Sequence, residues 1–395
     1  MIYLDNNATT RILPEVREAM LPWLDEDGYG NPSAGYRFGK RARRAIDEAR
    51  AQVAALIDAE PEEIVFTSCG TESNNTALLS ALRCYPDRKV IVTSTTEHSA
   101  IEEPCQFFDS TGYDVRRNPV DSAGQLDLDA FRESLAPGET AIASLIWANN
   151  ETGMLFPIRE AAALAAGAGA LFHTDAVQAI GKHPISVRDA GISLLSMSGH
   201  KLHAPKGVGA LYVNRNIRFE PMFFGGGQEN ERRSGTENVA GIVGFGKAAE
   251  LARQALEENL SEELRALRDR FESAVLSTVE GTEINGDPTD SDARLTNTSN
   301  LYFPGVDGEG LLILLDEAGI CCSPGSACST GAVTPSRVLK AMGHSSERAR
   351  SSVRFSLSRF TTEAEIDQAV TAVSQAVGKL RVVMPRGGGR VISRR

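Results

Sequence analysis

The chain has 395 residues, of which 42% are hydrophobic and 24% are charged. This length is too great for a single core, so we expect two domains. The formal net charge of -11 argues against nucleic acid as the main partner, because binding to phosphate requires a basic face. No apolar stretch reaches membrane-spanning length and the first residues do not form a signal peptide, so we expect a cytoplasmic protein with no membrane partner. The six cysteines fit no disulfide framework in so long a chain and should be reduced thiols.

The first part of the chain is predicted to be a short strand, a polar turn and two helices. The strand and the turn occupy residues 3–10, and a helix is expected over residues 14–24. A loop at residues 28–33 leads to a long amphipathic helix over residues 37–57. Its small and apolar residues recur on one stripe, namely Ala42, Ala45, Ile46, Ala49, Val53 and Leu56.

A strand expected at residues 64–67 is followed by a turn that contains Gly70 and Thr71 and opens a helix. Such a turn offers backbone N–H groups, a hydroxyl and the positive end of the helix to a phosphate. An ordinary helix N-cap is the alternative explanation of the same stretch.

Two further expected strands end in polar side chains. His98 follows the strand at residues 90–93, and it either stacks on a cofactor ring or caps a helix. Asn150 follows the strand at residues 141–147, and its amide either binds a cofactor or substrate or belongs to a simple turn.

The centre of the sequence carries the strongest functional signal. Apolar runs at residues 170–172 and 192–197 predict neighbouring buried strands of a parallel sheet, joined by a crossover. Asp175 follows the first run and Lys201 the second, and ligands bind at the carboxyl ends of parallel strands. A lysine that forms a Schiff base and a carboxylate that keeps a pyridine nitrogen protonated suit pyridoxal phosphate (PLP). A surface pair is the simpler alternative for either residue alone.

Other polar residues accompany this pair. Gln178 lies three residues after Asp175, and Ser198 and His200 flank Lys201. Few structural roles require so many polar groups where buried strands end, so these residues favour the functional interpretation.

After a strand at residues 210–213, the segment 225–238 contains several glycines and arginines together with Thr236. This composition suits the binding of an anion or of a partner subunit, although a solvated loop would have the same residues.

The remaining residues predict a second domain. A core helix opens it, with apolar residues at helical spacing from Leu260 to Val279. A strand at 300–303, a helix at 311–318 and a strand at 352–356 follow. Arg354 in the last strand either holds a carboxylate or, on an edge strand, faces water.

The segment 323–332 is small and polar, so we expect a mobile loop that carries the exposed thiol of Cys328. Such a thiol is often incidental. Cys321 and Cys322 are adjacent and would supply zinc ligands poorly, so no metal site is expected. Residues 381–395 are predicted to form a disordered basic tail.

Taken together, these motifs resemble those of the PLP-dependent cysteine desulfurases of the NifS/IscS type, and the NifS branch is the more similar. The resemblance extends from Tyr3 to about Leu380, and Cys69 stands where the IscS branch typically has glycine. Its specific parts are the stretches at residues 5–10, 68–73, 147–153, 173–178, 199–207, 325–328 and 354–359.

The resemblance implies an α/β protein of the fold-type I, class V aminotransferase-like architecture that works as a homodimer. A large PLP-binding domain with a mainly parallel mixed sheet is expected at residues 15–258. Residues 1–14 and 259–380 would form a smaller α+β domain that carries the cysteine loop.

The resemblance also implies a role for each candidate residue. Lys201 would form the Schiff base, and Cys328 would be the nucleophile that keeps sulfur from L-cysteine as a persulfide while L-alanine leaves. An Fe–S scaffold protein or another acceptor would then receive the sulfur, and the NifS branch implies nitrogenase clusters as one destination. For the cofactor ring, the resemblance implies Asp175 at the pyridine nitrogen, Gln178 at the ring hydroxyl, and His98 stacked on the ring and active in proton transfer. The phosphate would be held by Gly70, Thr71, Ser198 and His200, together with Thr236 of the other subunit. The substrate carboxylate would be held by Asn150 and Arg354.

Two other hypotheses account for parts of this pattern. Another fold-type I activity, such as an aminotransferase or a selenocysteine lyase, would keep Lys201 and Asp175 but would not need Cys328. A non-catalytic sulfur-transfer scaffold would need Cys328 but no intact cofactor pocket.

Overall fold

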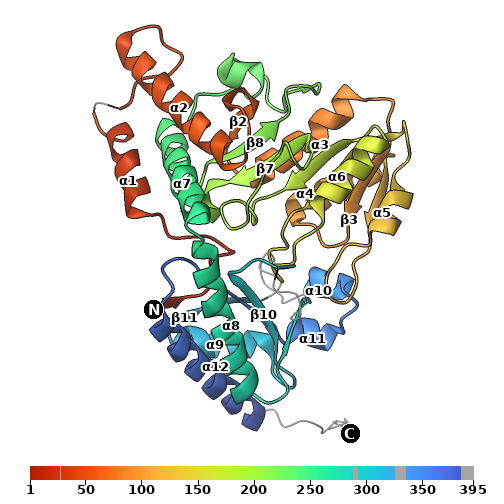
Figure 1. Ribbon diagram of the computed structural model, residues 1–395, viewed down its shortest axis with the longest axis vertical. Coiled ribbons are helices and arrows are strands. Elements are labelled where there is room, and N and C mark those ends of the chain that lie inside the picture. Colours follow the sequence, from red (N-terminus) through yellow and green to blue (C-terminus); the bar gives the residue numbers. More distant parts are fainter. Residues whose placement is uncertain (27, 288–291, 325–334, 384–395) are drawn as a thin grey trace, which may run out of the picture.

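The computed structural model describes residues 1–26, 28–287, 292–324 and 335–383. The chain forms an upper body built on a seven-stranded sheet and a lower body built on a four-stranded sheet (Figure 1). Within the described ranges, no helix is long and apolar enough to cross a membrane.

The sheet of the upper body is mixed and mainly parallel. Only one strand, β8, runs antiparallel to its neighbours β2 and β7. The strands from β7 to β4 are all parallel, which agrees with the predicted α/β class. Across the sheet the order is β2 (Ile64–Thr67), β8 (Gly209–Val213), β7 (Leu194–Ser198), β6 (Leu171–Asp175), β5 (Thr140–Ile146), β3 (Val90–Ser94) and β4 (Asp114–Asn118).

Both faces of this sheet are covered by helices, which explains why its strands are almost continuously apolar. Side chains alternate between the two faces, so Ile64 and Phe66 pack into one core cluster and Val65 packs into another. The helices on the first face are α2 (Arg37–Leu56), α6 (Ile158–Gly167) and α7 (Val239–Glu257). Those on the second are α3 (Gly70–Cys84) and α4 (Ser99–Ser110). Two short helices, α1 (Pro14–Met20) and α5 (Leu128–Ser134), lie beside them.

The lower body has an antiparallel sheet and its own core. Three longer helices, α8 (Leu260–Thr278), α9 (Gly308–Glu317) and α12 (Glu363–Val383), pack in a cluster with Phe271, Leu301 and Phe355. The sheet order is β12 (Ser323–Pro324), β13 (Ser352–Ser356), β10 (Thr298–Tyr302) and β9 (Glu283–Ile284). The short helices α10 (Arg337–Ala341) and α11 (Ser346–Arg350) lie beside the lower body (Figure 1), but their buried residues Val338, Leu339 and Ala349 belong to the core cluster of the upper body.

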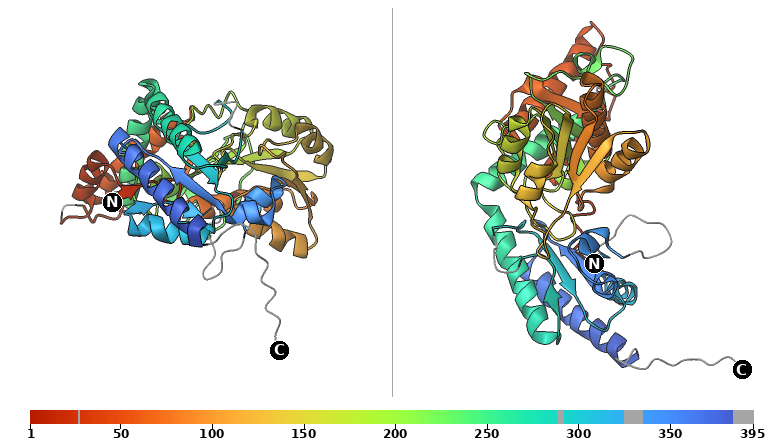
Figure 2. Two further views of the ribbon diagram at one scale, coloured as in Figure 1. Left: turned by 90° about the horizontal axis from the view of Figure 1, so that it is seen from below. Right: turned by 90° about the vertical axis from the view of Figure 1, so that its right-hand side faces the viewer.

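The N-terminus belongs to the lower body, because β1 (Ile2–Tyr3) pairs with β11 (Ile320–Cys321). Helices α7 and α8 follow one another down one side of the molecule and connect the two bodies (Figure 2). We propose that the bodies are the two domains expected at residues 15–258 and at 1–14 with 259–380. Helix α12 extends through residue 383, three residues into the predicted tail, and residues 384–395 lie outside the described residues.

Of the two interpretations of Arg354, the alternative that it faces water from an edge strand is wrong. Strand β13 lies between β12 and β10, and Arg354 is 1% exposed. A guanidinium buried in this way needs partners of opposite charge or accepting oxygens, which the site supplies.

Helices α2 and α7 approach closely enough that one glycine is required between them. A Cβ added to Gly246 would lie 2.5 Å from Ala49 Cα of α2. We therefore expect Gly246→Ala to lower the free energy of unfolding by about 1–3 kcal/mol, measured by urea denaturation. The matched control is Gly378→Ala in α12, where a Cβ would meet open space. It should be neutral or stabilising by up to about 1 kcal/mol, and equal stability of both variants would contradict this packing.

Candidate active site

The pairing of β6 with β7 brings the two central candidate residues to one edge of the sheet. Asp175 ends β6, where it lies opposite Ser196 of β7. Lys201 lies three residues beyond the end of β7, in the short 3-10 turn Gly199–Lys201. Both side chains line one cavity of about 270 Å³.

The same cavity gathers ten of the twelve residues predicted for the site. Thr236 is exposed on its loop and does not line the cavity, and Cys328 lies outside the described residues. The residues that line it are Gly70, Thr71, His98, Asn150, Asp175, Gln178, Ser198, His200, Lys201 and Arg354.

Asp175 is held by two hydrogen bonds and is 4% exposed. Its Oδ2 accepts from Asn74 Nδ2 at 2.7 Å, and its Oδ1 accepts from the backbone N–H of Val177 at 3.0 Å. These contacts orient a carboxylate that is otherwise surrounded by protein, as a partner for a protonated ring nitrogen requires. Sequence reasoning missed Asn74, which reaches the carboxylate from the first turns of α3.

The start of α3 has the donors that a phosphate needs. Cys69 is the N-cap residue, but its side chain makes no capping hydrogen bond, so the first N–H groups are not occupied by an N-cap side chain. A Cβ on Gly70 would lie 2.7 Å from Val177 Cγ2, so the close approach at the start of the helix favours glycine. Ser198 Oγ is buried and has no hydrogen-bond partner among the described residues. These donors, with the Thr71 hydroxyl, fit the phosphate of PLP.

His200 lies beside these donors. Its Nδ1 is 3.1 Å from Thr9 Oγ1, and burial, with a smaller contribution from nearby Lys201, lowers its pKa to about 4. The ring is therefore neutral near pH 7 and can hydrogen-bond without adding charge.

His98 both caps a helix and lines the cavity, so the two interpretations of this residue are compatible. Its Nδ1 accepts from the backbone N–H of Ala100 at 3.1 Å, and α4 begins directly after it. Burial lowers its pKa, although Asp175 opposes the shift. A neutral ring whose Nδ1 is an acceptor carries its proton on Nε2.

Arg354 is a buried guanidinium that lines the cavity and is anchored by two hydrogen bonds. Its Nη2 donates to Asp5 Oδ1 at 2.7 Å and its Nη1 to the carbonyl oxygen of Asn150 at 2.9 Å. Arg354 Nε has no partner among the described residues although it is buried. A donor of this kind beside the cavity can receive the carboxylate of a small substrate.

The N-terminal residues close the cavity from the side of the lower body. Lys201 Nζ donates to the carbonyl oxygens of Asn7 and of Ala8, the latter at 2.7 Å. Sequence reasoning quoted the polar run at residues 5–10 as a motif but assigned no role to Asn7. The signal was the accumulation of amides and hydroxyls directly after a short strand.

Comparisons with known proteins agree with this arrangement. The family "Aminotransferase class-V" matches residues 2–369. NifS of Azotobacter vinelandii, a cysteine desulfurase, is 50% identical over 389 residues, which cover 98% of this chain and 95% of that protein. The chain belongs to the cysteine desulfurases of the aminotransferase class-V family. The resemblance inferred from the motifs is thus confirmed, and the cofactor of this family is PLP.

Two further proteins, one compared by sequence and one by structure, are similar to this chain over nearly its full length. "Cysteine desulfurase 2" of Trichormus variabilis is 50% identical over 385 residues and covers 98% of this chain and 95% of its own length. A solved structure described as a NifS-like protein has 34% sequence identity and a TM-score of 0.89, and the match covers 96% of this chain and 100% of that one. The fold-type I architecture expected from the sequence is therefore confirmed.

The side chain of Glu97, next to His98, is buried, and the protonation state of its carboxyl group provides a test of that burial. Its Oε1 accepts from Ser94 Oγ at 2.6 Å and from the N–H of Ile146 at 3.0 Å, while Oε2 has no partner among the described residues. Burial raises its pKa to about 8, so the folded protein holds a proton on Glu97 that the unfolded chain loses near pH 4.5. The stability that this proton contributes is complete below about pH 4.5 and is lost as the pH rises through 8.

We expect Glu97→Gln, whose neutral amide mimics the protonated acid, to lose less stability between pH 5 and pH 8.5 than the unsubstituted protein. The melting temperature of the variant relative to the unsubstituted protein should rise by more than about 3 °C over this range. Glu103→Gln removes an exposed carboxylate from α4, the helix that follows Glu97, and should show no such change. A constant difference between Glu97→Gln and the unsubstituted protein would show that Glu97 is ionised in the fold.

Proposed function

We propose that this enzyme converts L-cysteine to L-alanine and holds the released sulfur as a persulfide on Cys328. The observation that carries the proposal is the single cavity lined by Lys201, Asp175 and Arg354 together. A lysine and a buried carboxylate suit PLP, and an arginine with a donor that no described residue occupies suits the carboxylate of an amino acid.

When bound, PLP supplies an electron sink that weakens the bonds to Cα of an amino acid. We assign Asp175 to the pyridine nitrogen and Gln178 to the ring hydroxyl, and we assign His98 to the face of the ring. The phosphate belongs at the start of α3, where the open N–H groups, Thr71, Ser198 and the neutral ring of His200 are the donors.

The protein's own groups then act in a defined order. Arg354 and Asn150 bind the substrate carboxylate, and Lys201 takes the proton from Cα. The thiolate of Cys328 attacks the substrate Sγ, so an S–S bond forms as the Sγ–Cβ bond breaks. The electron pair of the broken bond remains with Cβ, which takes up a proton. Lys201 returns the proton to Cα, and L-alanine leaves. The sulfur stays on the enzyme until an acceptor takes it.

The contacts of the described residues on both sides of Cys328 support its role. Ser323 Oγ donates to Asp5 Oδ2 at 2.8 Å, and the other oxygen of Asp5 binds Arg354. On the far side of residues 325–334, Arg337 Nη2 donates to the carbonyl oxygen of Glu97 at 2.7 Å, directly before His98. Both ends of the cysteine segment are therefore tied to residues around the substrate.

The neighbour of Arg337 makes a similar contact. Ser336 Oγ caps α10 and also donates to Glu151 Oε2, and Glu151 directly follows Asn150. Burial raises the pKa of Glu151 to about 7, so near neutrality a large share of this carboxyl group is protonated.

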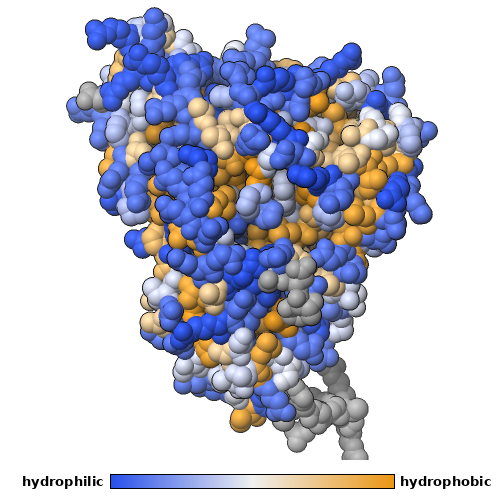
Figure 3. Space-filling view, viewed as in Figure 1, coloured by the Kyte–Doolittle hydropathy of each residue, from blue (hydrophilic) through white to orange (hydrophobic). Residues whose placement is uncertain are grey.

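We also propose that the protein is a homodimer in which Thr236 reaches the phosphate of the other subunit. Thr236 is exposed and outside the cavity of its own chain. The ion pair between Arg233 and Glu72, at 2.9 Å, anchors the loop of Thr236 to helix α3. The exposed threonine is therefore held close to a fixed point of the upper body. Large apolar side chains of the upper body, including Phe107 (62% exposed) and Phe224 (73% exposed), suit a protein partner. Apolar side chains interrupt the hydrophilic surface of the upper body on the face shown in Figure 3.

The acceptor of the sulfur is proposed from the relatives alone. Because NifS of Azotobacter vinelandii is a close relative, we propose an Fe–S scaffold protein, in the cytoplasm, as the acceptor. Supply of sulfur for nitrogenase clusters is the specific form of this proposal.

Substitution of Cys328 by serine separates desulfuration from the steps before it. Serine is nearly isosteric, but its hydroxyl stays protonated near neutral pH and is a poor nucleophile toward sulfur. We expect Cys328→Ser to bind PLP and to change its absorption spectrum on addition of L-cysteine. It should form no persulfide and produce L-alanine at least about 100-fold more slowly.

Cys321→Ser and Cys322→Ser are the matched controls and should stay active. Burial raises the pKa of the Cys322 thiol far above its usual range, so this thiol is a poor nucleophile. Alanine production by Cys328→Ser at the normal rate, with sulfide released directly, would identify a lyase in which this thiol is incidental.

Mixed dimers test the role of Thr236. We expect Thr236→Ala alone to weaken PLP binding about tenfold, because a hydrogen bond to a charged group is lost. A heterodimer of Thr236→Ala and Lys201→Ala chains should contain one site with normal PLP affinity, since its intact Lys201 meets the intact Thr236 of the other chain. PLP titration followed by absorbance measures this, and the absence of any normal site would show that Thr236 acts within its own chain. Unchanged PLP affinity of the Thr236→Ala homodimer would show that Thr236 does not act at the phosphate.

A further inference from the structure

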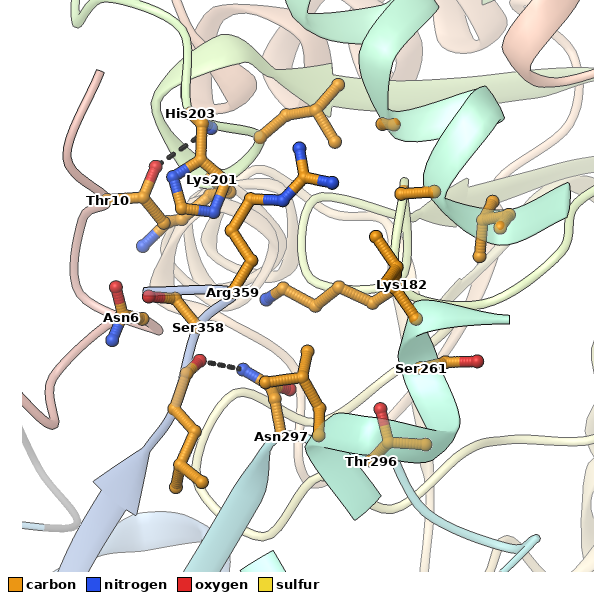
Figure 4. Close-up of a pocket in the computed structure, with 18 of the residues that line it drawn as sticks. Asn6, Thr10, Lys182, Lys201, His203, Ser261, Thr296, Asn297, Ser358 and Arg359 are labelled. Carbon is orange, nitrogen blue, oxygen red and sulfur yellow. Dashed lines mark hydrogen bonds between the residues drawn. The ribbon is translucent and has the colours of Figure 1, made fainter. Parts of the chain in front are cut away.

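A second cavity lies on the far side of Lys201, at the junction of the two bodies. It encloses about 80 Å³ and is lined by apolar residues of α7 and α8 and by the polar side chains labelled in Figure 4. Lys182 extends across this cavity, with its nitrogen on the side of Ser358 and Arg359 (Figure 4). The proposed reaction assigns no role to this lysine, although its side chain reaches two residues of the active site.

The first of these residues is Gln178. Lys182 Nζ donates to Gln178 Oε1 at 3.0 Å, and Gln178 Nε2 donates to the carbonyl oxygen of Asn7 at 2.9 Å. An ammonium group can only donate and a carbonyl oxygen can only accept. The two partners together therefore determine where the oxygen and where the NH₂ group of the Gln178 amide lie. With Lys182 in place, the NH₂ group of Gln178 must face away from the lysine and toward the site.

The second residue is Asn7. Its Oδ1 accepts from Lys182 Nζ at 3.4 Å and from Asn297 Nδ2 at 3.1 Å, so its Nδ2 faces the other way. That Nδ2 donates to the carbonyl oxygen of Asn150 at 3.2 Å, which also accepts from Arg354 Nη1. A continuous line of hydrogen bonds therefore runs from Lys182 to the arginine that we assign to the substrate carboxylate.

The charge of Lys182 is costly at this place. Among the described residues it forms no ion pair with a carboxylate. Burial lowers its pKa to about 7, and the nearby cations Lys201 and Arg354 act in the same direction. An apolar side chain of the same length would fill this space without that cost, so packing alone does not explain a lysine here.

We propose that Lys182 is a positioning residue, whose side-chain nitrogen donates the hydrogen bonds that orient the amides of Gln178 and Asn7 toward the cofactor and the substrate-binding arginine. The inference rests on the proposed function, because it uses the roles of Gln178 and Arg354 given there. It adds a group behind the site that touches neither cofactor nor substrate.

Three variants of the full-length enzyme test this inference. Lys182→Met removes the charge and the donors but keeps the length of the side chain, Lys182→Arg keeps the charge and the donors, and Lys40→Met removes an exposed lysine from α2 as the control. The measurements are the dissociation constant for PLP, the absorption maximum of the bound cofactor, and KM and kcat with L-cysteine.

We expect Lys182→Met to weaken PLP binding about tenfold, to shift the absorption maximum and to raise KM several-fold with a smaller change in kcat. Lys182→Arg should recover at least half of the lost PLP affinity, and Lys40→Met should match the unsubstituted enzyme. PLP affinity and KM of Lys182→Met within twofold of the unsubstituted enzyme, together with an unchanged absorption maximum, would overturn the inference.

A double substitution keeps the test decisive if Lys182→Met lowers stability. In a Gln178→Ala background the amide that Lys182 orients is absent, so adding Lys182→Met should change PLP affinity less than twofold. A further tenfold loss there would mean that the lysine acts through general stability and would also overturn the inference. Failure of the unsubstituted enzyme to bind PLP would instead contradict the proposed function, so the two failures can be distinguished.

Discussion

The parallel pairing of β6 with β7 is the constraint on which the active site depends. Because both strands run in the same direction, their carboxyl ends meet at one edge of the sheet, and Asp175 and Lys201 enter the same cavity. Helix α3 starts at that edge as well and adds the donors for a phosphate. A shift of one residue in this register would turn every side chain of one strand to the opposite face of the sheet.

The sheet supplies only half of the site, and the N-terminal segment joins it to the lower body. The backbone N–H of Asn7 donates to Ser356 Oγ of β13, and the Thr10 hydroxyl donates to the carbonyl oxygen of His200 beside Lys201. Asp5 binds Arg354 of β13 in a buried ion pair. Removing one partner of such a pair costs about 3–5 kcal/mol, so this segment has little freedom to vary. The arginine that we assign to the substrate and the lysine that we assign to the cofactor are thus held relative to each other by Asp5, Asn7 and Thr10.

The sequence allowed much of this to be predicted, for physical reasons that apply to particular elements. Strands such as β2 and β7 are short apolar runs before polar turns, and buried parallel strands have this pattern. Strand β4 escaped prediction because it is an edge strand with the sequence Asp-Val-Arg-Arg-Asn, and edge strands tolerate charges that internal strands do not. Helix α4 contains Pro104, which argues against a helix in sequence-based reasoning.

The candidate site, like the fold, could be predicted only in part from the sequence. The candidate residues at strand ends were predicted because strand direction alone brings them together. Asn74 and Asn7 were not, because they reach the site from a helix turn and from the chain's beginning, and only tertiary structure shows those contacts. The position of Cys328 lies outside the described residues, so its role remains a proposal.

The most direct test of the central assignment is the covalent location of the cofactor. The purified protein should be yellow, and reduction with borohydride followed by peptide mass spectrometry should place the pyridoxyl group on Lys201. The Lys201→Ala variant should yield no reducible adduct. A pyridoxyl group on another lysine of the unsubstituted protein, or an adduct that persists in Lys201→Ala, would contradict the site described here.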